Sequence, residues 1–279
     1  MANRSILTEE HIGKFERDGF LHIPREEHDL VAEPSNLSEW ASEILSWPRE
    51  KGKWMPYDEV NQRGEKQLMR TENVVAYFSP VSDLLLGEGV LSILKQLSGK
   101  DAFLFKDKIN YKLPYANGFV AHIDAPAYYH MGEMPFMEVM VVVDAQTPAN
   151  GCLEFVPGSH KAAPSLVNGG RISDEWEKNH DFVKLDLKPG DMVVFGSRIA
   201  HRSGPNLTGK RRAAIFGTYH FEAHRPEMSA EYWAHRRVNF PPDHEREEGE
   251  SYEAGFKLFG YSSPFTKPEV TNVPTPVTG

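Results

Sequence analysis

Apolar residues in the first hundred positions recur at the three- and four-residue spacing of amphipathic helices. This pattern predicts helices over residues 8–19, 36–47 and 81–97. Thr8 has the side chain of a helix N-cap, and Gly19 is suited to end the first helix. Residues 20–23 form a short apolar run typical of a strand. We therefore expect residues 1–100 to be mainly helical.

The pattern changes after residue 101, where apolar runs shorten, β-branched residues become more frequent and turn dipeptides separate the runs. The predicted strands are 102–112, 118–124, 137–144, 152–156, 182–187, 191–196 and 212–221. Asn150-Gly151, between two of these runs, predicts a hairpin turn. Many short strands between such turns indicate a sandwich or barrel of the jelly-roll kind.

Helical, charged sequence with interspersed aromatic residues returns at 226–259. The final residues, 264–279, are rich in Pro and Thr and predict a disordered tail. We expect one domain over residues 1–263: a mainly β fold whose jelly-roll core, about 102–222, is flanked by helices from both ends of the chain.

Composition excludes several classes of function. The 279 residues are 40% hydrophobic and 25% charged, with a formal net charge of −9. This charge argues against non-specific nucleic-acid binding, which depends on Lys and Arg contacts to phosphate. No apolar run approaches the length of a membrane span. The composition carries no pattern that predicts an oligomeric state.

One cysteine, Cys152, rules out an intrachain disulfide framework and fits a reducing compartment. Because free cysteines are usually buried, we expect Cys152 to be a packed thiol and not a nucleophile. The N-terminal sequence lacks the apolar core of a secretory signal. We expect a cytoplasmic enzyme.

His122 and Asp124 are two positions apart on the predicted strand 118–124. Side chains at this spacing point to the same face, roughly 6.6 Å apart along the strand, so both can reach one metal ion. Alone the pattern is weak, because His220-Phe221-Glu222 has the same spacing. A third ligand at His201, beyond the strand 191–196, would complete two histidines and one carboxylate. That ligand set is typical of non-haem iron(II) oxygenases.

These motifs carry a family resemblance. The chain resembles the phytanoyl-CoA dioxygenase family of iron(II)- and 2-oxoglutarate-dependent oxygenases over most of its length. The matching segments are Leu7-Thr8-Glu9-Glu10, Phe15 to Phe20, His122-Ile123-Asp124, Asp144, Asn150 to Lys161, Pro189-Gly190-Asp191, and His201 to Asn206 with Arg212. Their order and spacing all agree, which makes the resemblance specific.

The resemblance implies a double-stranded β-helix fold, with His122, Asp124 and His201 as the iron ligands. Arg212 matches the arginine that pairs with the distal carboxylate of 2-oxoglutarate, and Ser203 matches a hydroxyl that shares this carboxylate. If the strand begins one residue differently, Arg211 takes the place of Arg212.

A strand before the iron motif also resembles one that contacts the cosubstrate. Strand alternation puts Lys108, Asn110 and Lys112 on one face of it. We predict Asn110 and, less directly, Lys108 as cosubstrate contacts.

The implied reaction decarboxylates 2-oxoglutarate to succinate and CO2, consumes O2 and hydroxylates a C–H bond of a small molecule. Related halogenases lack the carboxylate ligand, so Asp124 argues against halogenation. Two alternatives remain open on the same fold. One is a natural-product tailoring enzyme that performs desaturation, epoxidation, ring expansion or endoperoxide formation. The other is a sensor that binds 2-oxoglutarate and metal without turnover.

The loop from Ala125 to Phe136 follows the metal motif and is rich in aromatic residues and methionine. We predict Tyr128, Tyr129 and Met137 as substrate contacts. An equally favoured alternative is that this loop is a lid that packs on the C-terminal helix. The segment Arg236 to Glu247 resembles a branch of the family labelled as 2-aminoethylphosphonate dioxygenases, which suggests a small anionic substrate. A peroxisomal location lacks a clear signal, because the chain ends Val277-Thr278-Gly279.

Overall fold

The computed structural model describes residues 6–265, and its strands form two antiparallel sheets. In spatial order, the large sheet is β1 (Phe20–Ile23), β11 (Met192–Gly196), β6 (Met137–Val142), β13 (Arg212–His220), β4 (Phe103–Lys112), β3 (Lys66–Glu72) and β2 (Met55–Val60). The small sheet is β10 (Val183–Lys184), β7 (Leu153–Phe155), β12 (His201–Ser203), β5 (Phe119–His122), β9 (Arg171–Ile172) and β8 (Leu166–Asn168). Each of the predicted strand ranges contains a strand, and the expected mainly β class with flanking helices is confirmed.

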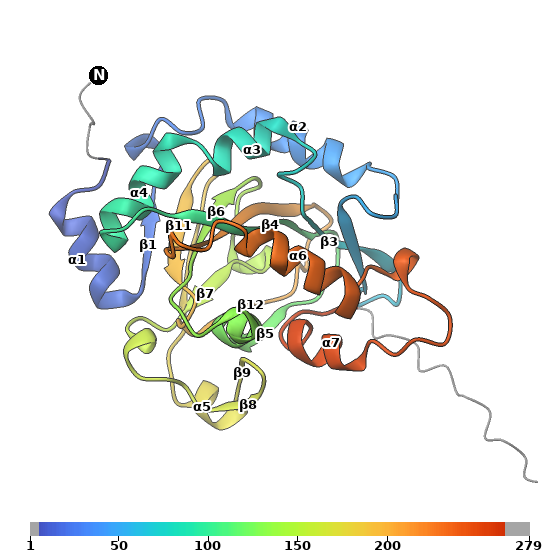
Figure 1. Ribbon diagram of the computed structural model, residues 1–279. Helices are drawn as coiled ribbons and strands as arrows, with labels where there is room; N and C mark the ends of the chain where they lie inside the picture. Colours follow the sequence, from blue (N-terminus) through green and yellow to red (C-terminus); the bar gives the residue numbers. More distant parts are fainter. Residues whose placement is uncertain (1–5, 266–279) are drawn as a thin grey trace, which may run out of the picture.

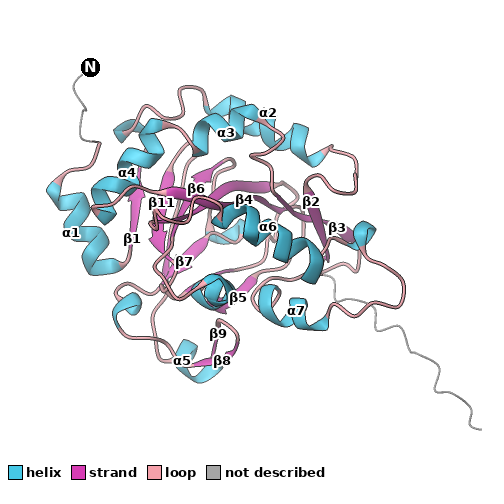
Figure 2. Ribbon diagram, viewed as in Figure 1, coloured by secondary structure: helices cyan, strands magenta, loops and turns pink. Residues whose placement is uncertain are grey.

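Helices surround the two sheets, as Figures 1 and 2 show. The α-helices are α1 (Glu9–Asp18), α2 (Pro34–Leu45), α3 (Ser79–Leu85), α4 (Glu88–Ser98), α5 (Asp174–Lys178), α6 (Met228–Asn239) and α7 (Glu253–Phe259). The 3-10 helices are η1 (Arg25–Glu27), η2 (Ala125–Met131), η3 (Pro148–Asn150), η4 (Ser159–Lys161) and η5 (Asp243–Glu245). None of the helices within residues 6–265 is long and apolar enough to span a bilayer.

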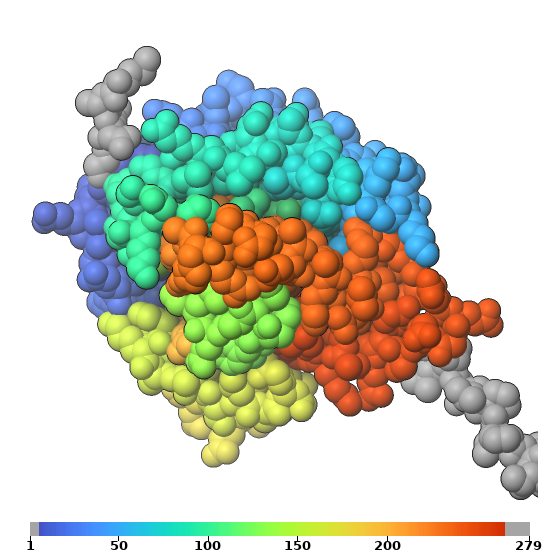
Figure 3. All heavy atoms as spheres, in the orientation of Figure 1, coloured from blue at the N-terminus to red at the C-terminus, as the bar shows by residue number. Residues whose placement is uncertain are grey.

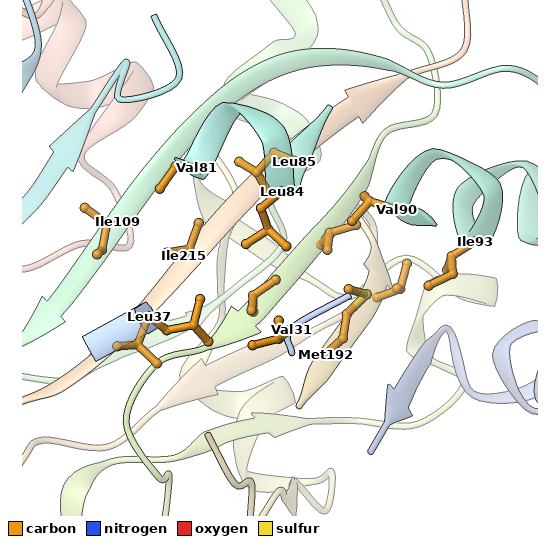
Figure 4. Close-up of a cluster of buried hydrophobic side chains, with 14 of the residues drawn as sticks. Val31, Leu37, Val81, Leu84, Leu85, Val90, Ile93, Ile109, Met192 and Ile215 are labelled. Carbon is orange, nitrogen blue, oxygen red and sulfur yellow. The ribbon is translucent and has the colours of Figure 1, made fainter. Parts of the chain in front are cut away.

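The main core lies between one face of the large sheet and helices α2, α3 and α4 (Figure 4). Ile109 and Ile215 are paired on neighbouring strands and belong to the same buried cluster as Val81, Leu84 and Leu85 of α3. A second apolar cluster, which includes Phe155, joins the opposite face of the large sheet to the small sheet. Two stacked sheets with a shared core are the arrangement expected of a jelly roll.

The first helix begins and ends as predicted. The Thr8 hydroxyl accepts a hydrogen bond from the backbone N–H of His11 (3.2 Å), and Gly19 ends the helix with φ 83°. The helix predicted over 81–97 is instead two helices, because Gly87 adopts an extended conformation between them. A Cβ there would lie 2.5 Å from the Asp83 carbonyl oxygen, so the close turn depends on glycine.

One expectation was incomplete and another was wrong. Helices α1 to α4 lie in the first hundred residues, as expected, but β2 and β3 also pair there and extend the large sheet. Asn150-Gly151 does not form a hairpin, because β6 lies in the large sheet and β7 in the small one. The Asn150 side chain accepts from the N–H of Thr147 (2.8 Å) and closes η3, so the turn carries the chain from one sheet to the other.

The C-terminal helical segment predicted over 226–259 contains α6 and α7. The predicted disordered tail, 264–279, lies mostly outside the described residues. Its described part departs from the expectation, because Phe265 is buried against Tyr57 and Phe240.

Candidate metal centre

His122, Asp124 and His201 are close enough to bind one metal ion: a ligand atom from each lies within 4.8 Å of the others. His122 ends β5 and lies opposite His201, the first residue of β12. Asp124 follows two residues after His122, with its carboxylate 3.5 Å from Nε2 of His122 and 3.7 Å from Nε2 of His201. The structure therefore brings the three predicted ligands together from two paired strands.

Hydrogen bonds orient both imidazoles toward this centre. Nδ1 of His122 donates to the Val120 carbonyl oxygen (2.7 Å), and Nδ1 of His201 donates to the Ile199 carbonyl oxygen (3.0 Å). A carbonyl can only accept, so each Nδ1 carries the proton and each Nε2 keeps a lone pair for a metal.

The electrostatic surroundings favour neutral histidine and ionised aspartate. Burial, with His122 adding to it, lowers the pKa of His201 to about 4. Burial opposes ionisation of Asp124, but His201 and His122 outweigh it and hold the pKa of this carboxyl well below its usual range. These are the protonation states in which imidazole and carboxylate bind metals.

Backbone contacts fix the turn that carries Asp124. Its N–H donates to the Ser197 carbonyl oxygen (2.9 Å), and the Tyr261 hydroxyl donates to the Ile123 carbonyl oxygen (2.9 Å). Gly170 packs against this turn so closely that a Cβ there would lie 2.2 Å from the Ile123 oxygen. Segments distant in sequence thus hold the carboxylate in place.

The three side chains face a cavity between the sheets and the C-terminal segment. The large sheet contributes Arg70, Glu72, Lys106, Lys108, Asn110, Arg212 and Phe216 to its lining. Helix α6 contributes Tyr232 and Arg236, and the segment after α7 contributes Tyr261, Ser262 and Ser263. Figure 3 shows α6 beside η2 on the outer face of this region, where His235 and His130 stack with ring centroids 4.3 Å apart.

All four predicted cosubstrate contacts line this cavity: Lys108, Asn110, Ser203 and Arg212. Arg212 is buried, and its guanidinium pairs with no carboxylate of the described residues; only Gln146 accepts from it. Arg211 forms an ion pair with Asp144 (2.9 Å) and donates to Ser38 and Ser42, so it points away. The structure thus places Arg212, not Arg211, at the cavity.

The sequence did not single out Lys112, although alternation put it on the same face as Asn110. Its ammonium is buried and donates to the Ser203 hydroxyl (2.8 Å) and to the carbonyl oxygens of Gly151 and Gly204. This contact holds Ser203 at the cavity wall.

The sequence also missed a buried cluster of Arg70, Glu72 and Arg236. Glu72 accepts from Arg236 through both carboxylate oxygens (3.0 and 2.9 Å) and from Arg70 (3.1 Å). Burial alone would raise the pKa of Glu72, but the two arginines outweigh it and lower the pKa to about 2. The available indication was that Arg70 and Glu72 are two positions apart, the spacing that puts side chains on one face of a strand, in a region expected to be helical.

The predicted substrate contacts lie in different places. Tyr128 lines the cavity, and its hydroxyl donates to Glu138 (3.0 Å). Tyr129 is exposed, and Met137 packs against the apolar core beneath α2 to α4, so neither lies in the lining. Cys152 is buried, as expected for a packed thiol.

Comparisons with known proteins agree with this geometry. The sequence profile described as phytanoyl-CoA dioxygenase (PhyH) matches residues 15–214. The chain is 43% identical to dioxygenase lolE1 of Epichloe uncinata over 85% of this chain and 92% of the relative. It is 33% identical to 2-aminoethylphosphonate dioxygenase of an uncultured bacterium over 93% of this chain and 99% of the relative.

A solved structure shares the fold. The structure of EctD from S. alaskensis with 2-oxoglutarate and 5-hydroxyectoine superposes with a TM-score of 0.66 at 22% identity, covering 78% of each chain. This likeness supports the predicted jelly-roll core.

Proposed function

Because the chain belongs to the phytanoyl-CoA dioxygenase (PhyH) family of iron(II)- and 2-oxoglutarate-dependent dioxygenases, we propose that it hydroxylates a C–H bond of a small molecule, with release of succinate and CO2. The observation that carries the proposal is the convergence of His122, Asp124 and His201 on a cavity that also holds the unpaired Arg212.

The donor set fits iron. Two imidazoles and one carboxylate occupy one face of an octahedral ion and leave the other face for cosubstrates. Bound iron and 2-oxoglutarate would supply the activation of O2 that oxidises the substrate. We propose His122, Asp124 and His201 as the iron ligands. Asp124 fills the position that a halide would need, which favours hydroxylation over halogenation.

The cavity also fits 2-oxoglutarate. A buried guanidinium without an anionic partner is costly, and a carboxylate can accept two hydrogen bonds from it. We propose that Arg212 binds the distal carboxylate. Ser203 accepts from Lys112, so its own hydroxyl hydrogen remains to donate to the same carboxylate. Asn110 accepts from Arg70 (2.7 Å), which leaves its amide N–H groups for the cosubstrate.

For the substrate we propose a small molecule with an anionic head group. The relative named 2-aminoethylphosphonate dioxygenase, which aligns with nearly the whole chain, supports this class. The cationic side chains of the lining support it as well. A natural-product substrate with another oxidative outcome on the same iron remains the alternative, and the mass of the product separates the two.

We further propose that residues 1–263 act as a single domain, in the cytoplasm, on a small molecule and without nucleic acid. Helices from both ends of the chain pack on the same large sheet, which supports a single unit. The net charge of −9 supports the absence of a nucleic-acid partner.

The test is an anaerobic titration of the purified protein with Fe(II) and then 2-oxoglutarate, followed by oxygen and a substrate panel. We expect a visible charge-transfer band on adding 2-oxoglutarate, and succinate formation that needs Fe(II), 2-oxoglutarate and a substrate. The product should gain one oxygen atom; a loss of two hydrogen atoms would indicate desaturation instead. Absence of the band would overturn the proposal, and a band without turnover on any substrate would favour a sensor.

A further inference from the structure

We propose that Lys106 is the binding residue for the anionic head group of the substrate, a phosphonate or carboxylate held between η2 and α6. This inference rests on the proposed oxygenase function and adds a specific contact to it.

Some cationic side chains on the cavity wall already have a carboxylate partner, and others do not. Arg70 and Arg236 both pair with Glu72, so their guanidinium groups already have a buried carboxylate. Three lining cations form no ion pair with any described residue: Lys106, Lys108 and Arg212. The lining carboxylate that pairs with no arginine is Asp124, which lies between His122 and His201. If Asp124 binds the metal and Arg212 binds 2-oxoglutarate, the lysines remain without a counterion.

Lys106 is the better placed of the two lysines. It is buried, with 8% of its surface exposed, and its ammonium lies 4.6 Å from the ring centroid of Tyr128 and 5.9 Å from that of Tyr232. These rings belong to η2 and α6, which cover the cavity from outside. An aromatic clamp of this kind holds an ammonium in position but leaves its N–H donors unfilled.

Lys106 donates no hydrogen bond to a described residue. An anionic oxygen in the cavity would therefore accept from N–H donors that have no protein partner. Burial, with Lys108 adding to it, lowers the pKa of Lys106 to about 7. A bound anion would favour the charged ammonium and reverse part of this shift. The site is therefore built to gain from an anion.

Glu138 offers the competing explanation, in which Lys106 serves only as its counterion. Glu138 is fully buried, and one of its oxygens accepts from Tyr128 and Thr218 while the other has no partner. Its carboxylate attracts Lys106 but forms no ion pair with it within 4 Å, and Glu138 does not line the cavity. The experiment must therefore separate the two roles.

The experiment measures the binding of methylphosphonate and of acetate to the anaerobic protein loaded with Fe(II) and 2-oxoglutarate, by calorimetry. The two probes distinguish a phosphonate from a carboxylate preference. We expect Lys106→Met to weaken binding of the preferred anion by about tenfold to a hundredfold, because a charged hydrogen bond is lost. The 2-oxoglutarate charge-transfer band should form as in the wild type, and exposed Lys100→Met should bind the anion normally.

A second variant keeps the test decisive if Lys106→Met folds poorly. Lys106→Met combined with Glu138→Gln removes both charges, and we expect anion binding to stay weak in it while Glu138→Gln alone binds normally. Recovery of anion binding in the double variant would assign Lys106 to Glu138 and overturn the proposal. So would wild-type protein that forms the band but binds neither anion, whereas failure of the band itself would count against the oxygenase function.

Discussion

His201 lies directly opposite His122 in the pairing of β12 with β5, with the two imidazole centroids 4.0 Å apart. The pairing of two short strands thus sets the separation of two ligands that are distant in sequence. Because each Nδ1 is held by the backbone carbonyl two residues earlier, the ring positions depend on backbone geometry. A metal bound here would meet a site whose shape already exists.

Replacing His201 by Ala should therefore remove iron binding and leave the fold intact. Since loss of a group that only supports a ligand costs about 10–100-fold in metal affinity, loss of the ligand itself should exceed that. An Fe(II) titration measures the change, and circular dichroism verifies the fold. His224→Ala, at an exposed histidine outside the cavity, is the matched control. Equal affinity in both variants would refute the assignment of His201.

Arg212→Met should weaken 2-oxoglutarate binding by about tenfold to a hundredfold, because a charge-assisted contact is lost. Iron binding should persist. Arg211→Met is a close control, since Arg211 lies one residue away but pairs with Asp144 on the other face. The dissociation constant from the charge-transfer band provides the comparison. If Arg211→Met weakened 2-oxoglutarate binding as much as Arg212→Met does, the assignment of Arg212 would be wrong.

Gly170→Ala should lower both iron affinity and the thermal midpoint. A Cβ at this position would lie 2.2 Å from the Ile123 oxygen and 2.6 Å from the Tyr261 hydroxyl, so the turn that carries Asp124 must shift. Gly13→Ala, in exposed helix α1 with no atom within 4 Å of the added Cβ, should be neutral or stabilising by up to about 1 kcal/mol. Matched scanning calorimetry and Fe(II) titrations of both variants test this; unchanged iron affinity in Gly170→Ala would contradict it.

Glu72→Gln should destabilise the protein by about 3–5 kcal/mol at pH 7, because it leaves two buried arginines without their carboxylate. The pKa of Glu72 is lowered from 4.5 to about 2 in the folded state, so its stabilisation is fully present above pH 4.5. It is lost as the pH falls from there toward 2.

Urea unfolding at several pH values measures this dependence. The difference in stability between wild type and Glu72→Gln should stay constant from pH 7 to about 5 and shrink below about 4.5. A difference that stayed constant down to pH 3 would show that the arginines do not hold Glu72 ionised.

The sequence was most informative where interactions between neighbouring residues determine the structure. Thr8 and Gly19 bound the first helix because capping and left-handed glycine are local effects. The same reasoning failed to predict the two strands in segment 55–72. Arg70 and Glu72 of this segment are buried because they meet Asn110 and Arg236 from other parts of the chain, so no apolar alternation marks it as a strand.

The same distinction applies to the site. The three candidate metal ligands and Arg212 could be predicted because their motifs and spacing resemble a known family. Lys106 and Arg236 could not, since their importance depends on which side chains the fold places opposite them. Met137 shows the reverse error: it lies near the substrate loop in sequence, but its strand turns the side chain into the core.

Tyr261, Ser262 and Ser263 complete the cavity, although they follow the last strand by some forty residues. On a ribosome, the three metal ligands are all made by residue 201, whereas this part of the wall leaves the tunnel much later. Because the Tyr261 hydroxyl also donates to the Ile123 carbonyl oxygen in the turn that carries Asp124, this late segment supports the metal centre as well as the cavity wall. Both are therefore completed together, by residues that are among the last to be synthesised.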